Sequence, residues 1–169
     1  MKKYRTRVLF ALACALMAAS VSWAVPIAIS NTAGLAFGKF VAGSGGTVTV
    51  SPGGVLRASG GVILMPSGAG AAAQFAVSGD ANLTYAISMP GNGVVSLVSD
   101  ANSMAVNNFT SSPNLTGKLG VGGTQTPFVG ATLGVSGNQT LFVGATLNVG
   151  SNQATGSYSG VFDVTVNYN

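Results

Sequence analysis

Short runs of β-branched and aromatic residues alternate with turns rich in glycine, asparagine and proline along most of this chain, and this pattern constrains its fold most strongly. After residue 24, no segment repeats its apolar residues at the 3.6-residue spacing of a helix, and 25 of the 169 residues are glycine, which weakens helices. Short strands separated by regularly spaced turns are typical of antiparallel sandwiches and barrels. We therefore predict an all-β fold, an antiparallel β-sandwich formed by one domain over residues 25–169.

Turn signals such as Ser51-Pro52-Gly53-Gly54 and Ser78-Gly79-Asp80 bound the predicted strands. Two segments rich in glycine, alanine and serine, 42–46 and 67–73, are predicted to be flexible connections. The predicted strands are 35–41, 47–51, 61–65, 74–78, 83–89, 94–99, 104–109, 115–119, 128–135, 141–149 and 158–168.

A tandem repeat of 14 residues occupies the region 126–153, where 126–139 and 140–153 agree at ten positions. A single tandem copy is too little for a solenoid, which needs about three units to bury one another's faces. Each copy holds one predicted strand and a turn, so we expect the duplication to form an extended hairpin with Ser136-Gly137-Asn138 near its tip. A duplication tolerated at a loop edge without functional meaning is the alternative.

The N-terminal region has the pattern of a secretory signal peptide. Lys2, Lys3, Arg5 and Arg7 precede an apolar run over 8–19, which is shorter than the roughly 20 residues of a membrane span. Small residues around Trp23 predict cleavage after Ala24, so that residues 1–24 are removed; cleavage after Ser20 is the alternative. We expect export through the inner membrane to the periplasm, and then to the cell surface or the medium.

The remaining chain carries few groups that could perform chemistry. Its three cations balance its three aspartates, and it has no histidine. It also has no cysteine, because the one cysteine of the whole sequence, Cys14, lies in the predicted signal. Nucleic-acid binding needs clustered cations, and zinc or hydrolytic sites need clustered histidine, cysteine or carboxylate side chains. We therefore predict no enzyme activity, no metal, no cofactor, no nucleic-acid partner and no membrane span after signal removal. The charged residues are Lys39, Arg57, Lys118, Asp80, Asp100 and Asp163.

The C-terminal segment shows the sharpest alternation. Tyr158, Gly160, Phe162, Val164, Val166 and Tyr168 share one face of a predicted strand, and the opposite face is mostly polar. This pattern indicates an ordered, half-buried last strand. From periodicity alone, it could simply be the final strand of a sandwich that packs on its own core.

The sequence also resembles two known families. Gly156, fourteenth from the end, and the penultimate Tyr168 resemble the C-terminal signature of chaperone–usher pilins. The segments Leu35-Ala36-Phe37-Gly38-Lys39-Phe40, Phe75-Ala76-Val77-Ser78-Gly79 and Val143-Gly144-Ala145-Thr146-Leu147 resemble the DUF4402 family of bacterial secreted proteins. The pilin resemblance implies an immunoglobulin-like sandwich that lacks its last strand. It also implies that Gly156, Tyr158, Phe162, Val164, Val166 and Tyr168 face first a periplasmic chaperone and then a neighbour's donor strand.

A donor strand would have to come from the start of the processed chain. Val25, Ile27 and Ile29 alternate correctly but form a short donor, and Pro26 lacks a main-chain N–H. Cleavage after Ser20 would add Val21 and Trp23 to the same face.

Two functional hypotheses follow. The first is a structural subunit of an extracellular, fimbria-like filament, which associates with identical or related subunits by strand donation, with a chaperone and an outer-membrane usher as further partners. The second is a self-contained secreted coat or binding sandwich, with carbohydrate as one class of ligand.

Overall fold

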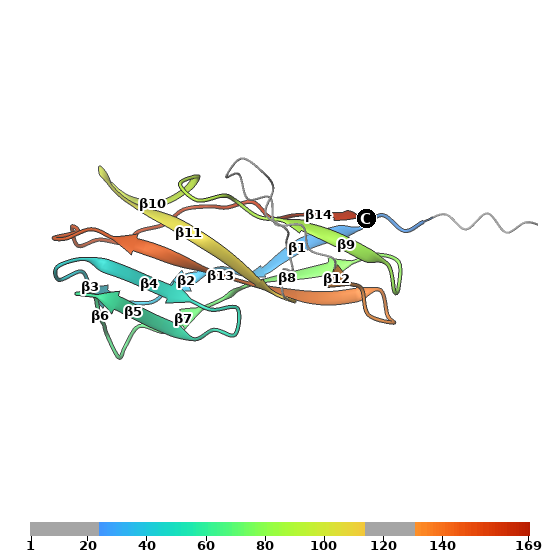
Figure 1. The fold of residues 1–169 in the computed structure, drawn as a ribbon, viewed down its shortest axis with the longest axis horizontal. Helices are drawn as coiled ribbons and strands as arrows, with labels where there is room; N and C mark the ends of the chain where they lie inside the picture. The colour runs from blue at the N-terminus through green and yellow to red at the C-terminus, as the bar shows by residue number, and fades with distance from the viewer. Residues whose placement is uncertain (1–23, 114–130) are drawn as a thin grey trace, which may run out of the picture.

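The computed structural model describes residues 24–113 and 131–169, and these residues confirm the all-β prediction (Figure 1). They form strands and turns without a helix, so no helix in this part of the chain is long and apolar enough to cross a membrane. The strands are β1 (Ala28–Ala33), β2 (Ala36–Phe37), β3 (Phe40–Val41), β4 (Gly46–Val50), β5 (Leu56–Gly60), β6 (Ile63–Leu64), β7 (Gly70–Ala71), β8 (Ala73–Ser78), β9 (Thr84–Ser88), β10 (Val95–Ser99), β11 (Asn102–Ser112), β12 (Ala131–Thr132), β13 (Asn138–Val149) and β14 (Thr165–Tyr168).

The strands form a β-sandwich of curled antiparallel sheets. The largest sheet has the order β1-β8-β13-β11-β10, and β4 and β5 continue it from the second half of β13. A second sheet has the order β12-β9-β14, and two small sheets pair β2 with β7 and β3 with β6. The long strand β13, orange in Figure 1, runs along most of the molecule and belongs to both of its halves.

Strand β13 changes its partner halfway along. Residues 138–143 pair with β8 and residues 145–149 pair with β4, while β11 lies along its other edge. At the change, a Cβ on Gly144 would collide with the main-chain carbonyl of Val50, so the close approach of β4 requires glycine. The alternating burial along β13 sends Leu141 and Val143 into one half of the core and Leu147 and Val149 into the other.

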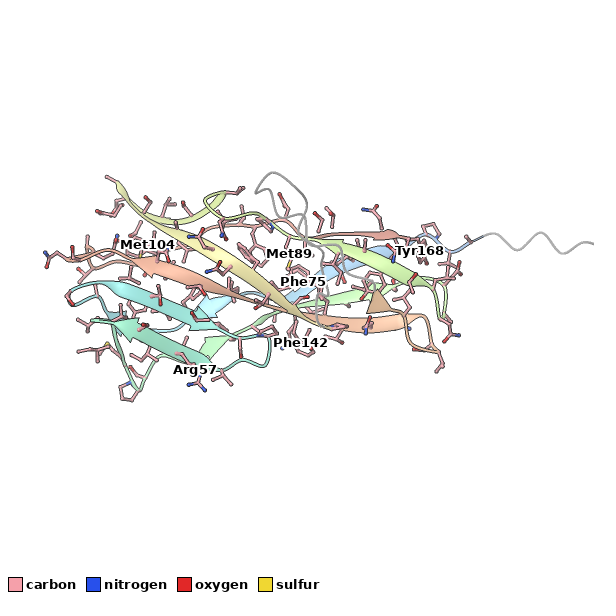
Figure 2. The ribbon with its side chains drawn as sticks, viewed as in Figure 1. Arg57, Phe75, Met89, Met104, Phe142 and Tyr168 are labelled. Carbon is pink, nitrogen blue, oxygen red and sulfur yellow. The ribbon has the colours of Figure 1, made fainter. Side chains whose placement is uncertain are left out.

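The core therefore consists of two hydrophobic clusters joined by β13. Figure 2 shows Phe75 and Met89 near the middle of the molecule and Met104 in the half away from the C-terminus. The terminal cluster, beside the chain ends, comprises Ala73, Phe75, Val77, Tyr85, Ile87, Met89, Leu133, Leu141, Val143 and Val166. The distal cluster comprises Phe37, Val48, Val50, Val62, Ala72, Val95, Met104, Val106, Ala145, Leu147 and Val149.

Several predicted elements differ from the observed ones. The segment 35–41 is divided into β2 and β3 because Gly38 takes a φ of +69° between them. Strands β1 and β5 were not predicted, and the segment 67–73, predicted to be a flexible connection, contains β7 and the first residue of β8. The predicted strand 115–119, the signal segment up to residue 23 and residues 126–130 of the repeat lie outside the described residues.

The extended hairpin predicted from the repeat is wrong over residues 131–149. Strand β12, from the first copy, pairs with β9, whereas β13, formed by the last two residues of the first copy and most of the second, pairs with β8, β4 and β11. The segment between them carries Leu133 into the terminal cluster, so the chain crosses from one sheet to the other. Ser136 and Gly137 form a turn, but this turn joins two sheets and is not the tip of a hairpin.

Candidate functional site

The C-terminal segment presents its alternating face to the core. Val166 is buried, the side chains of Tyr158, Phe162, Val164 and Tyr168 are half-buried, and Gly160 is exposed. Between them, Asp163, Thr165 and Asn167 are exposed, and Val161 is 90% exposed. The segment thus has one apolar and one solvent-facing side, as its sequence pattern indicates.

The apolar side chains of this segment lie across both hydrophobic clusters. Tyr158 packs on the distal cluster, whereas Val164 and Tyr168 pack on the terminal cluster. Phe162 contacts both clusters: its ring centroid is 6.2 Å from that of Phe75 in an edge-to-face arrangement and 5.1 Å from that of Phe109. The segment therefore covers the junction between the two halves of the core.

Only part of the predicted strand 158–168 forms a main-chain ladder. Residues 165–168 make β14 against β9, and Ser159 exchanges hydrogen bonds of 2.8 and 3.0 Å with Val98 of β10. Between these points, no strand among the described residues pairs with 160–164. The segment thus passes from the edge of one sheet to the edge of another, which ends its ladder early.

Strand β14 has an unpaired edge. It is the last strand in the order β12-β9-β14, so among the described residues no strand hydrogen-bonds to its other edge, although β1 lies close to it. The N–H of Asn169 donates to the carbonyl of Thr84, and the register pairs Tyr168 with Tyr85 and Val166 with Ile87. Since bonded and non-bonded pairs alternate in an antiparallel ladder, the main-chain groups of Val166 and Tyr168 point away from β9.

Gly156 lies where the C-terminal segment approaches β10. A Cβ at this position would come 2.5 Å from Oγ of Ser99, so a larger residue would have to displace that hydroxyl. Gly156 is exposed and has no hydrogen bond among the described contacts that would give it a binding role. Close packing against Ser99 therefore explains why residue 156 is glycine. The role of Gly156 in strand exchange stays a prediction.

The candidate donor residues pack within their own chain. Ile29 is in β1, which pairs with β8 at the edge of the largest sheet, and Ile27 precedes this strand. Both isoleucines are half-buried against the terminal cluster, while Val25 is 53% exposed. The structure thus brings the candidate donor and the C-terminal segment to the same cluster (Figure 1).

A polar contact joins the two ends of the described chain. The hydroxyl of Tyr168 donates to the carbonyl of Val25 at 2.9 Å and accepts from the N–H of Asp80. The carboxylate of Asp80 in turn accepts from the nitrogen of Val25 at 3.0 Å. The sequence pattern places Asp80 in a turn and indicates no further role for it; only its place in the connection between two sheets brings it to the chain ends.

The chemistry of this region is that of main-chain edges and apolar side chains. No group of three or more histidine, cysteine or carboxylate side chains that could hold a metal occurs in residues 24–113 and 131–169. Burial raises the pKa of Tyr85 above its ordinary value of 10.0, and its hydroxyl donates to Oε1 of Gln139 at 2.7 Å. The arrangement can bind an extended peptide by hydrogen bonding along an edge and by apolar contact.

Comparison with known proteins gives one match. A family model described as a domain of unknown function (DUF4402) matches residues 27–168, which span β1 to β14. No curated protein and no solved structure matches the chain.

Proposed function

For this chain, which belongs to the DUF4402 family, we propose a role as a structural subunit of an extracellular, fimbria-like filament that is assembled by strand donation. A periplasmic chaperone would hold the subunit after export, and an outer-membrane usher would pass it to the cell surface. The site is the side of the terminal cluster between β1 and the C-terminal segment. The resemblance of Gly156 and Tyr168 to the pilin signature supports the same role.

One observation carries this proposal: hydrophobic side chains at the border of the terminal cluster stay partly exposed where the two ends of the described chain meet. Its partly buried hydrophobic neighbours include Ile27 and Ile29 from the N-terminal segment and Phe162, Val164 and Tyr168 from the C-terminal segment. The adjacent edge of β14 leaves the main-chain groups of Val166 and Tyr168 unpaired with a strand. An added strand would satisfy these groups and cover the exposed parts of the five side chains.

Replacement of β1 by the same segment of a neighbour is a second way to form such a filament, distinct from a strand added at β14, because it uses contacts that the chain already makes with itself. Strand β1 is the outermost strand of its sheet and pairs only with β8. The same segment of a neighbouring copy could form the same ladder, because exchange of an identical element replaces one set of contacts by an equivalent set. Repeated head to tail, such an exchange produces an open chain of subunits, whereas β1 paired within its own chain produces a closed monomer.

The closed monomer is the second candidate, and the pairing of β1 with its own β8 favours it. In that case the protein would be a self-contained secreted coat or binding sandwich. Carbohydrate would be a difficult ligand for the described residues, because sugar sites commonly present an exposed aromatic face. Tyr85 is buried, and the half-buried Tyr158 and Tyr168 use their hydroxyls for bonds within the chain.

The decisive experiment examines material sheared from the surface of the source cells. It is run unheated and boiled on a denaturing gel and probed for this chain. A ladder of bands that collapses to one band on boiling supports strand-exchanged polymers. The reason is that main-chain hydrogen bonds and buried side chains between subunits resist detergent until the sample is heated. A single monomer band in the unheated lane would contradict the filament and support the closed sandwich.

Three variants locate the contact. Deleting residues 25–30 should leave a subunit that the chaperone binds as a monomer and that gives no ladder of bands on the gel. Ile29→Asp should remove the ladder too, because it places a charge on the packing face of β1. Ile63→Asp is the matched control, since Ile63 is 65% exposed in the small β3–β6 sheet, and its ladder should match the wild type. A full ladder from both N-terminal variants would contradict donation by this segment.

A further inference from the structure

The polar contact between the chain ends has the composition of a binding site for an amine. The nitrogen of Val25 lies 3.0 Å from Oδ2 of Asp80, and the carbonyl of the same residue accepts from Tyr168. The N–H of Asp80 donates to the Tyr168 hydroxyl, which closes a ring of three residues. Val25 is 53% exposed, so polar contacts rather than burial of its side chain fix its position.

A carboxylate is an unusual partner for an amide nitrogen in this protein. After the predicted signal is removed, Asp80, Asp100 and Asp163 are the only acidic side chains of the chain. One of these three lies at the nitrogen of the residue that follows the predicted cleavage site. A full positive charge on that nitrogen would complement the carboxylate far better than a neutral amide does.

The neighbouring residues shape this site around the tyrosine. Gly79 precedes Asp80, and a Cβ at this position would collide with the hydroxyl of Tyr168 and approach Leu133. Glycine at this position therefore lets the Tyr168 hydroxyl reach the turn and hold the main chain of Asp80. The carboxylate is thereby held beside the start of β1.

We propose that the precursor is cleaved between Ala24 and Val25 and that Asp80 binds the α-ammonium group that this cleavage creates. In the reaction, a peptidase adds water across the Ala24–Val25 amide, leaving a carboxylate on Ala24 and an amine on Val25 that takes up a proton. The inference rests on the predicted signal peptide and is independent of filament assembly.

The position of Asp80 also distinguishes between the two cleavage sites suggested by the sequence. Cleavage after Ser20 would place the ammonium on Val21 and leave the Val25 nitrogen as a neutral amide. Only cleavage after Ala24 brings the new charge to the carboxylate of Asp80. In the processed chain, the ion pair would fasten the start of β1 to the turn between β8 and β9, and Tyr168 would join it to the C-terminus.

The first test is the N-terminal mass of the exported protein, which should correspond to Val25–Asn169. The second test is a cycle of four proteins: the chain beginning at Val25 with a free amine or with an acetylated amine, each with Asp80 or with Asp80→Asn. Asparagine keeps an acceptor for an amide N–H but lacks the charge. Unfolding in urea at about pH 6, where an α-amine is protonated, measures the folding equilibrium constant.

We expect Asp80→Asn to lower this constant about two- to fivefold in the free-amine chain, the range for an exposed ion pair, and to have little effect in the acetylated chain. Asp100→Asn is the matched control, because it removes the same charge from a residue in the turn between β10 and β11, and its effect should not depend on acetylation. Equal losses from Asp80→Asn in both chains would overturn the proposal, as would a mature N-terminus other than Val25.

Discussion

The terminal and distal clusters are filled by similar side chains but are closed in different ways. The distal cluster is bordered by β4, β5 and the small β2–β7 and β3–β6 sheets, and Tyr158 and Phe162 of the C-terminal segment also pack on it. The terminal cluster is covered by β9, β14 and the segment leading into β1, so its cover consists largely of the two ends of the chain. The terminal half of the core is therefore covered by both ends of the described chain, whereas only the first part of the C-terminal segment reaches the distal half.

The tandem repeat supplies equivalent residues to both halves. Leu133 of the first copy lies in the terminal cluster, and its counterpart Leu147 lies in the distal cluster. Gln139 accepts from the hydroxyl of Tyr85, whereas its counterpart Gln153 donates to the hydroxyl of Tyr158. The duplication thus provides each cluster with a leucine and a glutamine bound to a tyrosine, although residues 131–132 of the first copy pair in a different sheet from their counterparts 145–146.

The largest expected effect tests the cover of the terminal cluster. Val166→Asp should prevent folding, because a carboxylate would replace a buried apolar side chain without an ionic partner. Soluble yield and circular dichroism measure the loss. Val161→Asp is the matched control on the same segment, and it should fold normally since Val161 is 90% exposed. A normally folded Val166→Asp protein would show that the terminal cluster does not need its C-terminal cover.

A pair of leucines on β13 tests whether the two clusters form one cooperative unit. Leu141 is buried in the terminal cluster and Leu147 in the distal cluster. Each change to alanine should lower the free energy of unfolding by about 2–5 kcal/mol, and each variant should unfold in one transition. Urea unfolding followed by circular dichroism provides the measurement. Two separated transitions in either variant would mean that the clusters unfold independently.

The contribution of β1 to its own chain should be smaller. Ile29→Ala should reduce the free energy of unfolding by about 1–2 kcal/mol, below the range for fully buried isoleucine, because this side chain is only half-buried. Ile63→Ala, at an exposed position beside the distal cluster, should stay within about 0.5 kcal/mol of the wild type. Equal losses in thermal or urea unfolding would show that β1 does not cover the terminal cluster.

The two tyrosines provide the smallest contrast. Tyr85→Phe should lower the free energy of unfolding by about 0.5–1.5 kcal/mol through its lost hydrogen bond, as measured by urea unfolding. Tyr158→Phe should lower it less, since Tyr158 is half-buried.

The pH dependence of stability gives a further test of Tyr85, because burial raises its pKa above the ordinary value of 10.0. The neutral form of Tyr85 stabilises the fold fully below pH 10.0, and this stability is lost as the pH rises through the folded-state pKa. Tyr85→Phe should therefore weaken the alkaline loss of stability, as measured by urea unfolding across that range. An unchanged alkaline slope would contradict this assignment.

Strong local patterns in the sequence predicted much of the fold. The alternation in 74–78 and 141–149 corresponds to buried faces of β8 and β13, and Ser51-Pro52-Gly53-Gly54 forms the expected turn between β4 and β5. Strand β5 was missed because Arg57 and Ser59 make an edge strand look polar. Strand β1 was missed as a core strand because Asn31 and Thr32 interrupt its apolar pattern.

The candidate site was only partly predictable. The alternating face of the C-terminal segment follows from a period of two, which is a local property of the sequence. The meeting of Val25, Asp80 and Tyr168 joins residues separated by 55, 88 and 143 positions, so it depends on how the sheets cross. Likewise, similarity between the repeat copies could not show that residues 131–132 would pair in one sheet and their counterparts 145–146 in another.

The contact between Tyr168 and Val25 means that the chain from Val25 onward nearly forms a closed loop. A circular permutant could join Asn169 to Val25 through a short linker and begin instead at Gly54, in the turn between β4 and β5. It would retain all fourteen described strands but have a peptide bond in place of the free amine that the proposed cleavage would create at Val25. The permutant would thus change the connectivity of the chain and keep its packing. Comparing it with the unpermuted chain would show which effects need free termini and which need only the strands that the two ends form.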